Sequence, residues 1–382
     1  MSNTLLITGG AGFIGQKLIA KLLSVNPNFD ITVLDNFSEQ VHDQLTASAP
    51  ILSKVRIIRA DIRDREVLKK LLQNASTLVH LAAETGTGQS MYKVSHYFDV
   101  NVQATANIVD ILKSLPGTGR IKNIVFASSR AVFGEGAYSC PLHGIVYPSY
   151  RNKIDLDAGR YEPLCPICNG SIDSIATSED APYNPSSYYG LTKQVQEQIL
   201  LMYAETAQIN CFSLKFQNVY GPGQSLKNPY TGILAVFSNL ARQKKVIDIY
   251  EDGFETRDFV YIDDVVSAIE KAIFFQGKFT GTLNIGSGVP TSIFDLASFV
   301  NEYFENESNY TLSGKYRLGD IRHNFANISK AKIVLGYTPK FTFLDGVRNF
   351  LSWVENEKVY DPNLYSESVK ELSSRGLMGG AN

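Results

Sequence analysis

The sequence predicts an α/β protein built on a doubly wound parallel sheet, with a smaller C-terminal α/β domain. Short apolar runs alternate with segments of helical period through the first half of the chain, and a glycine-rich turn directly follows the first run. Alternation of this kind sets parallel strands side by side and covers both faces of the sheet with helices. Ligands of such sheets bind beyond the carboxyl ends of the strands.

The expected elements follow in chain order. Strands are predicted over 4–8, 31–34, 55–61, 78–83 and 124–127, and helices over 64–72, 97–112 and 187–207. Asp64 is expected to cap the helix that it begins. Beyond residue 221 the pattern predicts a short strand over 246–250 and helices over 264–275, 292–304 and from 343 onward.

The glycine-rich turn has the spacing Gly9-x-x-Gly12-x-x-Gly15 between the first strand and a helix. Gly9 permits a sharp turn, Gly12 lets a pyrophosphate approach the backbone, and Gly15 lets the helix pack close to its strand. Asp35 ends the second strand, where a carboxylate binds the ribose hydroxyls and repels the 2′-phosphate of NADP. The alternative is an ordinary strand, turn and helix with a surface aspartate. We interpret the pattern as a Rossmann-type NAD site.

Composition and charge exclude several functions. The chain has 382 residues, a net charge of −2 and 19% charged residues, with no block of like charge that would bind nucleic acid or a membrane surface. No apolar stretch approaches the ~20 residues that span a bilayer. The sequence starts directly with a strand, without a signal-peptide pattern, and holds only four cysteines, so a cytoplasmic protein is expected.

Tyr189 and Lys193 are four residues apart in a predicted helix, so their side chains share a face. An ammonium about 6 Å from a phenol, at an effective dielectric near ~20, favours the phenolate by roughly 3 kcal/mol, or about two pKa units. Tyr189 is therefore expected to act as a general base toward a sugar hydroxyl, and Ser129, at the end of the fifth strand, to bind the same oxygen. Taken alone, such a pair more often marks a solvated helix face.

With these motifs the chain resembles the extended short-chain dehydrogenase/reductases, and within them the NAD-dependent nucleotide-sugar epimerase/dehydratase family. The resemblance covers about residues 3–357. It rests on the segments Thr8 to Gly15, Asp61-Ile62, His80 to Ala83, Ser128 to Gly134, Tyr189 to Lys193, Asn218 to Gly223, Arg257 to Val260 and Asn284 to Gly286.

The resemblance implies roles for single residues. Ser129 and Tyr189 would contact the reacting hydroxyl, and Lys193 would hold the nicotinamide ribose. The other residues implied at the cofactor are Gly9, Gly12, Phe13, Ile14, Gly15, Asp35, Asp61, Ile62, Ala82 and Ala83, with Asp61 and Ile62 at the adenine. Arg130, Asn218, Arg257 and Arg322 would bind the substrate, since a forked guanidinium suits a diphosphate. A surface salt bridge is the alternative role for Arg257 and Arg322.

The residues Arg130-Ala131 narrow the choice of possible reactions, because they stand where dehydratases of this family carry an Asp-Glu pair. Without an acid to expel water, we expect an epimerase that transiently oxidises C4 and returns the hydride to the other face of the sugar, with NAD retained. The segments Ser129 to Tyr138, Cys140 to Gly144, Cys165 to Cys168 and Gln217 to Ser225 resemble the dTDP-L-rhamnose 4-epimerase group, which interconverts dTDP-L-rhamnose and dTDP-6-deoxy-L-talose. The alternatives are a nucleotide-sugar 4-ketoreductase, a UDP-sugar 4-epimerase and a non-catalytic NAD-binding sensor.

The segment 135–177 shows no clear period and is rich in Gly, Pro, Tyr and Cys. Cys140-x-x-His143 and Cys165-x-x-Cys168 could together supply the four ligands of a structural Cys3His zinc site, which would stabilise a long loop. The alternatives are free thiols with a surface histidine, or a disulfide between Cys165 and Cys168. Cys211 and His80 lie in apolar strands and are predicted to be core residues.

Residues 1–221 are predicted to form the NAD-binding domain, with 135–177 as an insert and with the segments 256–286 and 341–357 rejoining it. Residues 222–255 and 287–340 would form the nucleotide-sugar-binding domain, and 358–382 a polar, loosely packed tail. The resemblance also implies a homodimer that forms through the helices over 97–112 and 187–207.

Overall fold

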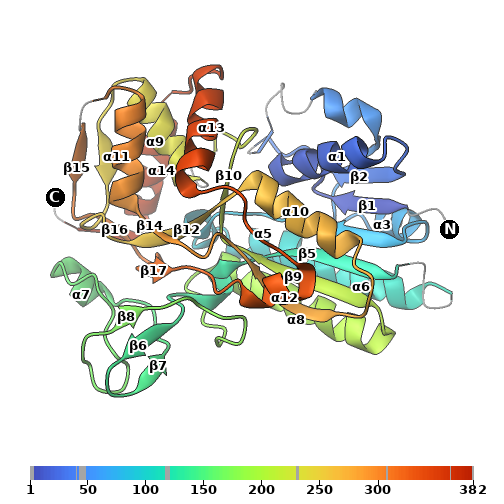
Figure 1. Ribbon diagram of the computed structural model, residues 1–382, viewed down its shortest axis with the longest axis horizontal. Coiled ribbons are helices and arrows are strands. Elements are labelled where there is room, and N and C mark those ends of the chain that lie inside the picture. The colour runs from blue at the N-terminus through green and yellow to red at the C-terminus, as the bar shows by residue number, and fades with distance from the viewer. Residues whose placement is uncertain are drawn as a thin grey trace.

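The computed structural model describes residues 4–39, 41–42, 49–116, 121–228, 232–306, 309–361 and 363–380. Within these residues a seven-stranded sheet runs in the order β3-β2-β1-β4-β5-β9-β13, and every neighbouring pair is parallel (Figure 1). The direction of winding reverses between β1 and β4, so the predicted doubly wound α/β class is confirmed. The strands are β1 (Leu5–Thr8), β2 (Ile31–Asp35), β3 (Arg56–Arg59), β4 (Thr77–His80), β5 (Asn123–Ser129), β9 (Asn210–Phe216) and β13 (Thr280–Ile285).

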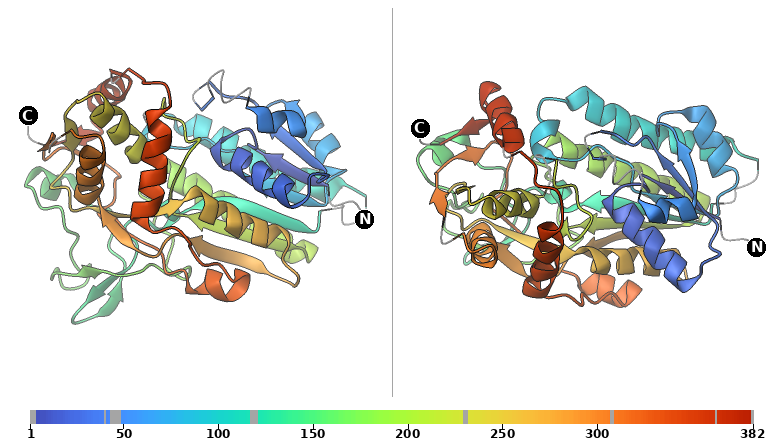
Figure 2. Two further views of the ribbon diagram at one scale, coloured as in Figure 1. Left: turned by 45° about the horizontal axis from the view of Figure 1, so that its top comes forward. Right: turned by 90° about the horizontal axis from the view of Figure 1, so that it is seen from above.

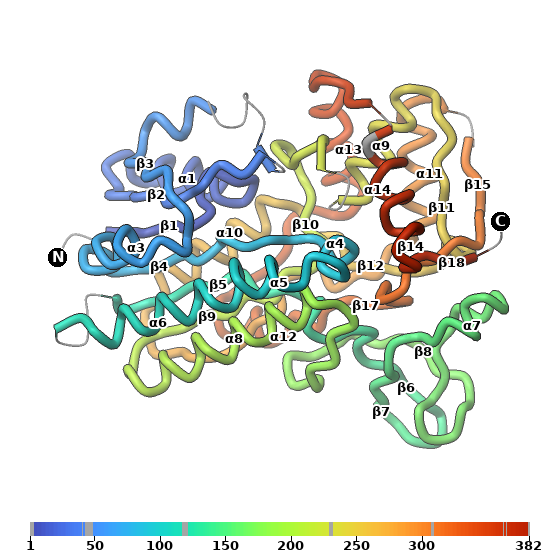
Figure 3. Tube along the Cα trace, turned by 180° about the vertical axis from the view of Figure 1, so that it is seen from behind, coloured from blue at the N-terminus to red at the C-terminus, as the bar shows by residue number. Residues whose placement is uncertain are grey.

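Helices cover both faces of this sheet. α1 (Phe13–Val25) and α10 (Ile262–Ile273) pack together on one face, whereas α3 (Arg65–Leu72), α6 (Ala104–Ser114) and α8 (Tyr188–Ala207) lie side by side on the other (Figure 3). Each face has its own apolar core. Leu5 and Ile7 of β1 point into the first core and Leu6 into the second, because side chains alternate along a strand. The strands are therefore apolar at successive positions, which is typical of a parallel sheet.

Side-chain caps mark the start of some of the helices. Asp64 accepts 3.1 Å hydrogen bonds from the N–H groups of Glu66 and Val67, which confirms its predicted role at the start of α3. Ser187 caps α8 in the same way through the N–H of Gly190, at 3.2 Å. None of the helices in the described part of the chain has the length and apolar character that crossing a bilayer requires.

The helix predicted over 97–112 is longer than expected and changes its winding. It continues from α5 (Val94–Tyr97) through a π-helical segment η2 (Phe98–Gln103) into α6. Asn101 in η2 accepts a 2.8 Å hydrogen bond from the N–H of Glu84 and donates a 3.1 Å bond to its carbonyl. The wider turn thus holds the loop that follows β4, an arrangement that apolar periodicity does not reveal.

A second region of strands and helices lies beside the carboxyl end of the sheet (Figures 1 and 2). Its main sheet joins β10 to β12 in parallel, and β12 also pairs with β14 and β17. α13 packs against both α9 and β12. The elements here are β10 (Asn218–Tyr220), α9 (Ile233–Arg242), β11 (Ile247–Ile249), β12 (Thr256–Tyr261), β14 (Pro290–Ser292), α11 (Ile293–Tyr303), β15 (Tyr310–Leu312), β17 (His323–Asn324) and α13 (Phe343–Glu355). α12 (Ser329–Leu335) instead packs against β13 and α10.

The predicted insert forms a small unit of its own that projects from the rest of the fold (Figure 1). β6 (Tyr138–Cys140) pairs with β7 (Gly144–Val146) and with β8 (Asp173–Ser174), and α7 (Lys153–Asp157) lies between β7 and β8 in the chain.

The polar tail is more ordered than its composition indicates. The tail forms α14 (Asn363–Ser374) and then β18 (Met378–Gly379), which pairs antiparallel with β16 (Tyr316–Arg317). Leu372 of α14 is only 3% exposed, and Glu371 accepts a 2.8 Å hydrogen bond from the hydroxyl of Tyr92. One apolar anchor and a few polar contacts order a segment whose composition alone indicates none.

A buried ion pair fixes α8 to the central sheet. Glu197 Oε1 on α8 lies 3.3 Å from Lys215 Nζ on β9, and both side chains are at most 1% exposed. Ser213 donates a 2.6 Å hydrogen bond to the other carboxylate oxygen, and the hydroxyl of Tyr183 donates to Oε1. Because α8 also carries Tyr189, this cluster helps to position the site described below.

Lys215→Met is expected to lower the free energy of unfolding by about 3 kcal/mol or more, because it leaves the charge of Glu197 buried without its cation. Urea denaturation followed by circular dichroism measures the change, with Lys70→Met on the exposed surface of α3 as the control. The double variant Glu197→Gln/Lys215→Met should recover part of the loss. Equal stability of Lys215→Met and Lys70→Met would show that the pair contributes nothing.

Candidate active site

A cavity of about 450 Å3 opens at the carboxyl ends of the central strands. Its walls come from the turn after β1, the ends of β2 and β5, the loop after β4 and one face of α8. The predicted residues that line it are Gly9, Gly12, Phe13, Ile14, Gly15, Asp35, Ile62, Ala82, Ala83, Ser129, Arg130, Tyr189, Lys193 and Asn218.

The glycine-rich turn at this cavity requires its glycines for different reasons. Gly9 has φ +70°, and a Cβ there would lie 2.6 Å from the backbone nitrogen of Ala82. A Cβ on Gly15 would lie 2.5 Å from the Cα of Gly10. Gly12 is different, since its Cβ would meet only the carbonyl of Gly9, at 3.3 Å, and otherwise face the cavity. This turn leaves backbone exposed at the N-terminus of α1, which is the geometry that receives a pyrophosphate.

Asp35 is positioned beside this turn and is only 7% exposed. Its carboxylate accepts hydrogen bonds from the N–H of Ala11, at 3.0 Å, and of Phe37, at 2.8 Å. His42 Nε2 lies 3.5 Å from the same carboxylate and also lines the cavity. A buried anion here suits ribose hydroxyls and repels a 2′-phosphate, so the residues present fit NAD.

Ser129, Tyr189 and Lys193 meet at the end of β5. Ser129 and Tyr189 both line the cavity, and the Ser129 hydroxyl accepts a 3.2 Å hydrogen bond from the N–H of Ala131. Lys193 Nζ donates a 2.9 Å hydrogen bond to the carbonyl of Ala127 and lies 6.0 Å from the centre of the Tyr189 ring. The predicted spacing on α8 therefore brings phenol and ammonium to one face.

The pKa of the Tyr189 phenol differs from the prediction. Burial raises it, whereas the hydrogen bond from Ser129 and the charge of Arg130 act in the opposite direction. Burial also lowers the pKa of Lys193 to about 7. The expected lowering by Lys193 neglected the desolvation of both groups, which disfavours phenolate and ammonium alike.

Arg130 connects this cavity with a smaller one beside it. It lines both, together with Arg257 in the smaller cavity. Burial, followed by the nearby charge of Arg257, lowers the pKa of Arg130 to about 9. The guanidinium of Arg257 donates to the carbonyls of Ile321, at 2.7 Å, and of Arg322, at 2.9 Å. The structure thus places two cations next to the cavity, as predicted for an anionic substrate.

Arg322 does not lie where the sequence predicted it. Its guanidinium binds Glu162, at 2.7 Å, Glu251, at 3.0 Å, and Asp252, at 2.7 Å, and the residue is 1% exposed and lines neither cavity. Carboxylates occupy its donors, so Arg322 joins protein segments rather than binding a diphosphate. The alternative role predicted for Arg322, a salt bridge, therefore applies, although the ion pairs are buried and not at the surface.

Asp61, which was predicted at the adenine, is not among the residues that line the cavity. Its carboxylate pairs with Arg63, with 2.8 Å between Nε and Oδ1, while Ala60 and Ile62 on either side of it line the cavity.

Several lining residues were not predicted. They include His42, Thr85, Thr87, Gln224 and Asn228. The polar run from Glu84 to Thr87 follows the fourth strand, and its place at the carboxyl end of a parallel strand was the available signal.

The remaining predicted residues lie away from the cavity. Cys140, His143, Cys165 and Cys168 converge in the insert. His80 is 1% exposed and lies 2.7 Å from Thr8 Oγ1, and burial lowers its pKa to about 3, so it is a neutral core residue as predicted. Cys211 is fully buried, also as predicted.

A Rossmann-type sheet with a Ser-Tyr-Lys group at its carboxyl edge defines the short-chain dehydrogenase/reductase class of fold and site. A family model described as NAD dependent epimerase/dehydratase family matches residues 5–149 and 168–286. The chain belongs to this family, and the prediction of the family is confirmed.

Similar proteins cover nearly the whole chain. The chain is 36% identical over 355 residues to the dTDP-L-rhamnose 4-epimerase of Burkholderia thailandensis, which covers 92% of this chain and 95% of that protein. It is 29% identical over 359 residues to the UDP-glucose 4-epimerase of Mycolicibacterium smegmatis, with coverage of 92% and 98%. The UDP-glucuronic acid 4-epimerase of Bacillus cereus, solved with UDP-glucuronic acid and NAD, superposes with a TM-score of 0.74 at 26% identity and coverage of 92% and 99%.

Replacing Arg130 by Met should raise the pKa of Tyr189, because the charge of Arg130 lowers it. A base is active above its pKa, so the fall of kcat/KM toward low pH should move to higher pH in the variant. The pH profile of kcat/KM measures this shift, and its position is independent of any uniform loss in substrate binding. Arg65→Met, on the exposed start of α3, is the control. An unmoved or downward shift would contradict the role of Arg130.

Proposed function

We propose that this protein is an NAD-dependent nucleotide-sugar 4-epimerase that interconverts dTDP-L-rhamnose and dTDP-6-deoxy-L-talose. The observation that carries the proposal is the meeting of Ser129, Tyr189 and Lys193 in a cavity whose glycine turn and Asp35 fit NAD. The choice of sugar is supported by 36% identity to a dTDP-L-rhamnose 4-epimerase over 92% of the chain.

Bound NAD supplies the reversible oxidation at the sugar carbon, and side chains of the protein take up and return the hydroxyl proton. The Ser129 oxygen accepts from the N–H of Ala131, which leaves its hydroxyl hydrogen free to be donated to a phenolate or a sugar oxygen. Tyr189 faces the same sugar oxygen. Its phenolate takes the proton of the sugar hydroxyl and later returns it. Lys193 contributes positive charge behind the phenol and is held in place by the carbonyl of Ala127.

Dehydration is disfavoured by the residues that follow Ser129. Arg130 and Ala131 begin the short helix η3 (Arg130–Phe133), and Arg130 lines the cavity. Neither residue is a carboxylic acid, so this position lacks the group that would protonate a leaving hydroxyl. Proton exchange at one hydroxyl, with oxidation and reduction of the same carbon, is the chemistry that remains.

UDP-sugars are a second candidate substrate class. This alternative is favoured by the 29% identity to a UDP-glucose 4-epimerase over nearly the same length of chain. This alternative differs from the leading proposal in the nucleobase and the sugar of the substrate. The groups of the protein that take part in the reaction are the same in both.

The deciding experiment incubates purified protein with dTDP-L-rhamnose and no added cofactor, and follows the sugar by proton NMR. We expect the talo isomer to appear until equilibrium is reached, because NAD is regenerated in each cycle. Conversion of UDP-glucose instead would favour the second class. Turnover of a 4-keto sugar only after addition of NADH would identify a reductase and contradict the proposal.

Tyr189→Phe should lower kcat by about 10²- to 10⁴-fold, because the variant has no group to take the proton. Nucleotide-sugar binding, measured by calorimetry, should stay within a few-fold of the wild type. Tyr188→Phe, its exposed neighbour on α8, is the matched control and should retain full activity. An active Tyr189→Phe variant would remove Tyr189 as the base.

We also propose a homodimer that forms through α6 and α8. These helices lie side by side on one face of the sheet, and Met202 of α8 is 71% exposed there. Light scattering coupled to gel filtration tests this assembly, and Met202→Glu should shift a dimer toward the monomer.

A further inference from the structure

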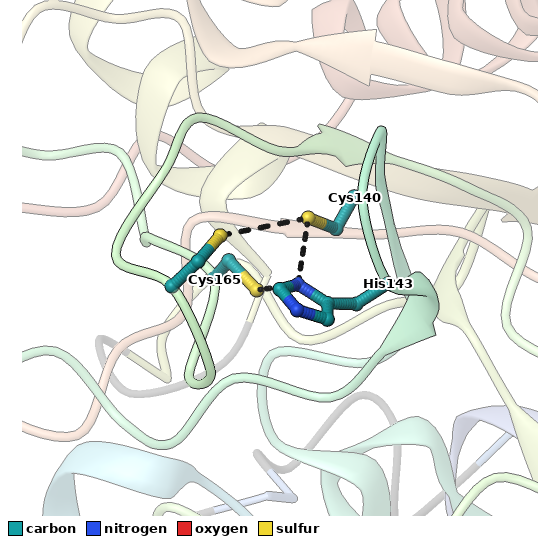
Figure 4. A group of neighbouring side chains, drawn as sticks. Cys140, His143 and Cys165 are labelled. Atoms are coloured by element: carbon teal, nitrogen blue, oxygen red, sulfur yellow. Dashed lines mark hydrogen bonds between the residues drawn. The ribbon is translucent and has the colours of Figure 1, made fainter.

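Two tight turns of the insert face each other and bring together three thiols and one imidazole. The β6–β7 hairpin carries Cys140 and His143, and the turn near the other end of the insert carries Cys165 and Cys168. Figure 4 shows Cys140, His143 and Cys165 pointing toward a common centre. We propose that these four residues bind one structural Zn²⁺ ion, which holds the insert in its fold. This proposal does not depend on the reaction proposed above.

The separations between the ligand atoms match the edges of a tetrahedral zinc site. With Zn–S near ~2.3 Å and Zn–N near ~2.05 Å, tetrahedral angles place two sulfurs about 3.8 Å apart and a sulfur and a nitrogen about 3.6 Å apart. Here Cys140 Sγ lies 3.9 Å from Cys168 Sγ and 3.5 Å from His143 Nδ1, and Cys165 Sγ lies 3.6 Å from the same nitrogen. All four ligand atoms lie within 4.8 Å of one another.

The thiols are not joined as a disulfide. A disulfide bond needs about 2.05 Å between the sulfurs, and all four cysteines of the chain are free. Four ligands complete a tetrahedral shell, so such an ion would have no open position for a substrate or water. The site is therefore structural and not catalytic.

The backbone around Cys165 is also arranged for a metal ligand. The N–H of Cys165 donates a 2.9 Å hydrogen bond to the carbonyl of Gly170, and the N–H of Asn169 donates one of the same length to the carbonyl of Cys165. These bonds close the tight turn whose two cysteines converge on Cys140 and His143.

The apolar core of the insert is small, and the insert is tied to the rest of the fold mainly by ion pairs such as Arg151–Glu251 and Glu162–Arg322. Its apolar cluster consists of Tyr138, Cys140, Val146, Cys165 and Ile172, so two of five members are proposed zinc ligands. Its strands have only two or three residues each. Of its other large apolar side chains, Leu156 is buried, whereas Leu142, Ile145, Leu164 and Ile167 are exposed to solvent. A metal that joins residue 140 to residue 168 supplies the missing cross-link.

The insert in turn supports the edge of the substrate region. Glu162, three residues before Cys165, binds Arg322 at 2.7 Å and His323 at 3.1 Å. The carbonyl of Arg322 accepts a hydrogen bond from Arg257. Residues 150–167, which include Glu162 and Cys165, lie between the two segments that the family model matches. The metal would thus stabilise an addition to the family fold that reaches toward the substrate side.

Metal analysis of the purified full-length protein by mass spectrometry tests the proposal. We expect about one zinc per chain, and at least a several-fold loss in Cys165→Ser and in Cys168→Ser. Cys211→Ala, which changes a buried cysteine outside the cluster, should keep its zinc, as should Tyr189→Phe whatever its activity. Zinc that is retained in both serine variants, or iron in place of zinc, would overturn the proposal.

A second measurement holds even where the serine variants fail to fold. Chelator-treated wild-type protein titrated with Co²⁺ should develop the intense visible absorption of tetrahedral cobalt together with a thiolate charge-transfer band. The chelator should also lower the melting temperature of the wild type and of Cys211→Ala, but not that of Cys168→Ser. A wild type that contains no zinc and gives no cobalt spectrum would end the proposal, and an unchanged melting temperature would remove the structural role.

Discussion

The parallel register of the central sheet is the constraint on which the site depends. It brings the ends of β1, β2, β4 and β5 to one edge, although they lie between Thr8 and Ser129 in the chain. α8 adds Tyr189 and Lys193, and the Glu197–Lys215 pair ties this helix to β9. Every reacting group thus comes from a rigid element anchored in the core, which limits motion between phenol, serine and cofactor.

Burial and positive charge act against each other at this edge. Burial raises the pKa of Tyr189 and lowers that of Lys193, so at neutral pH it lowers the fraction of phenolate and the fraction of ammonium together. Arg130 and the Ser129 hydroxyl oppose the effect on Tyr189. The pKa of Tyr189 is therefore set by several moderate effects and not by one ammonium. The same cations also suit a substrate that carries two phosphates.

Local pattern was sufficient for most of the fold, because strand alternation, the Asp64 cap and the glycine turn are properties of neighbouring residues. It was also sufficient to pair Tyr189 with Lys193. It failed for Arg322, whose carboxylate partners Glu162 and Asp252 lie 160 and 70 residues away in the chain. The folded tail was missed for the same reason, since β18 is ordered by pairing with β16 and not by its own sequence.

The ends of the chain differ in what they can tolerate. β1 begins at the edge of the sheet opposite the cavity, whereas α14 lies near the segment that follows β4 (Figure 3). In that segment the ring of Tyr92 lies 4.3 Å from the guanidinium of Arg375. Thr87 of the same loop lines the cavity. A purification tag or fusion partner is therefore better attached at the N-terminus. Shortening the chain from its C-terminus would remove a segment that supports the wall of the cavity.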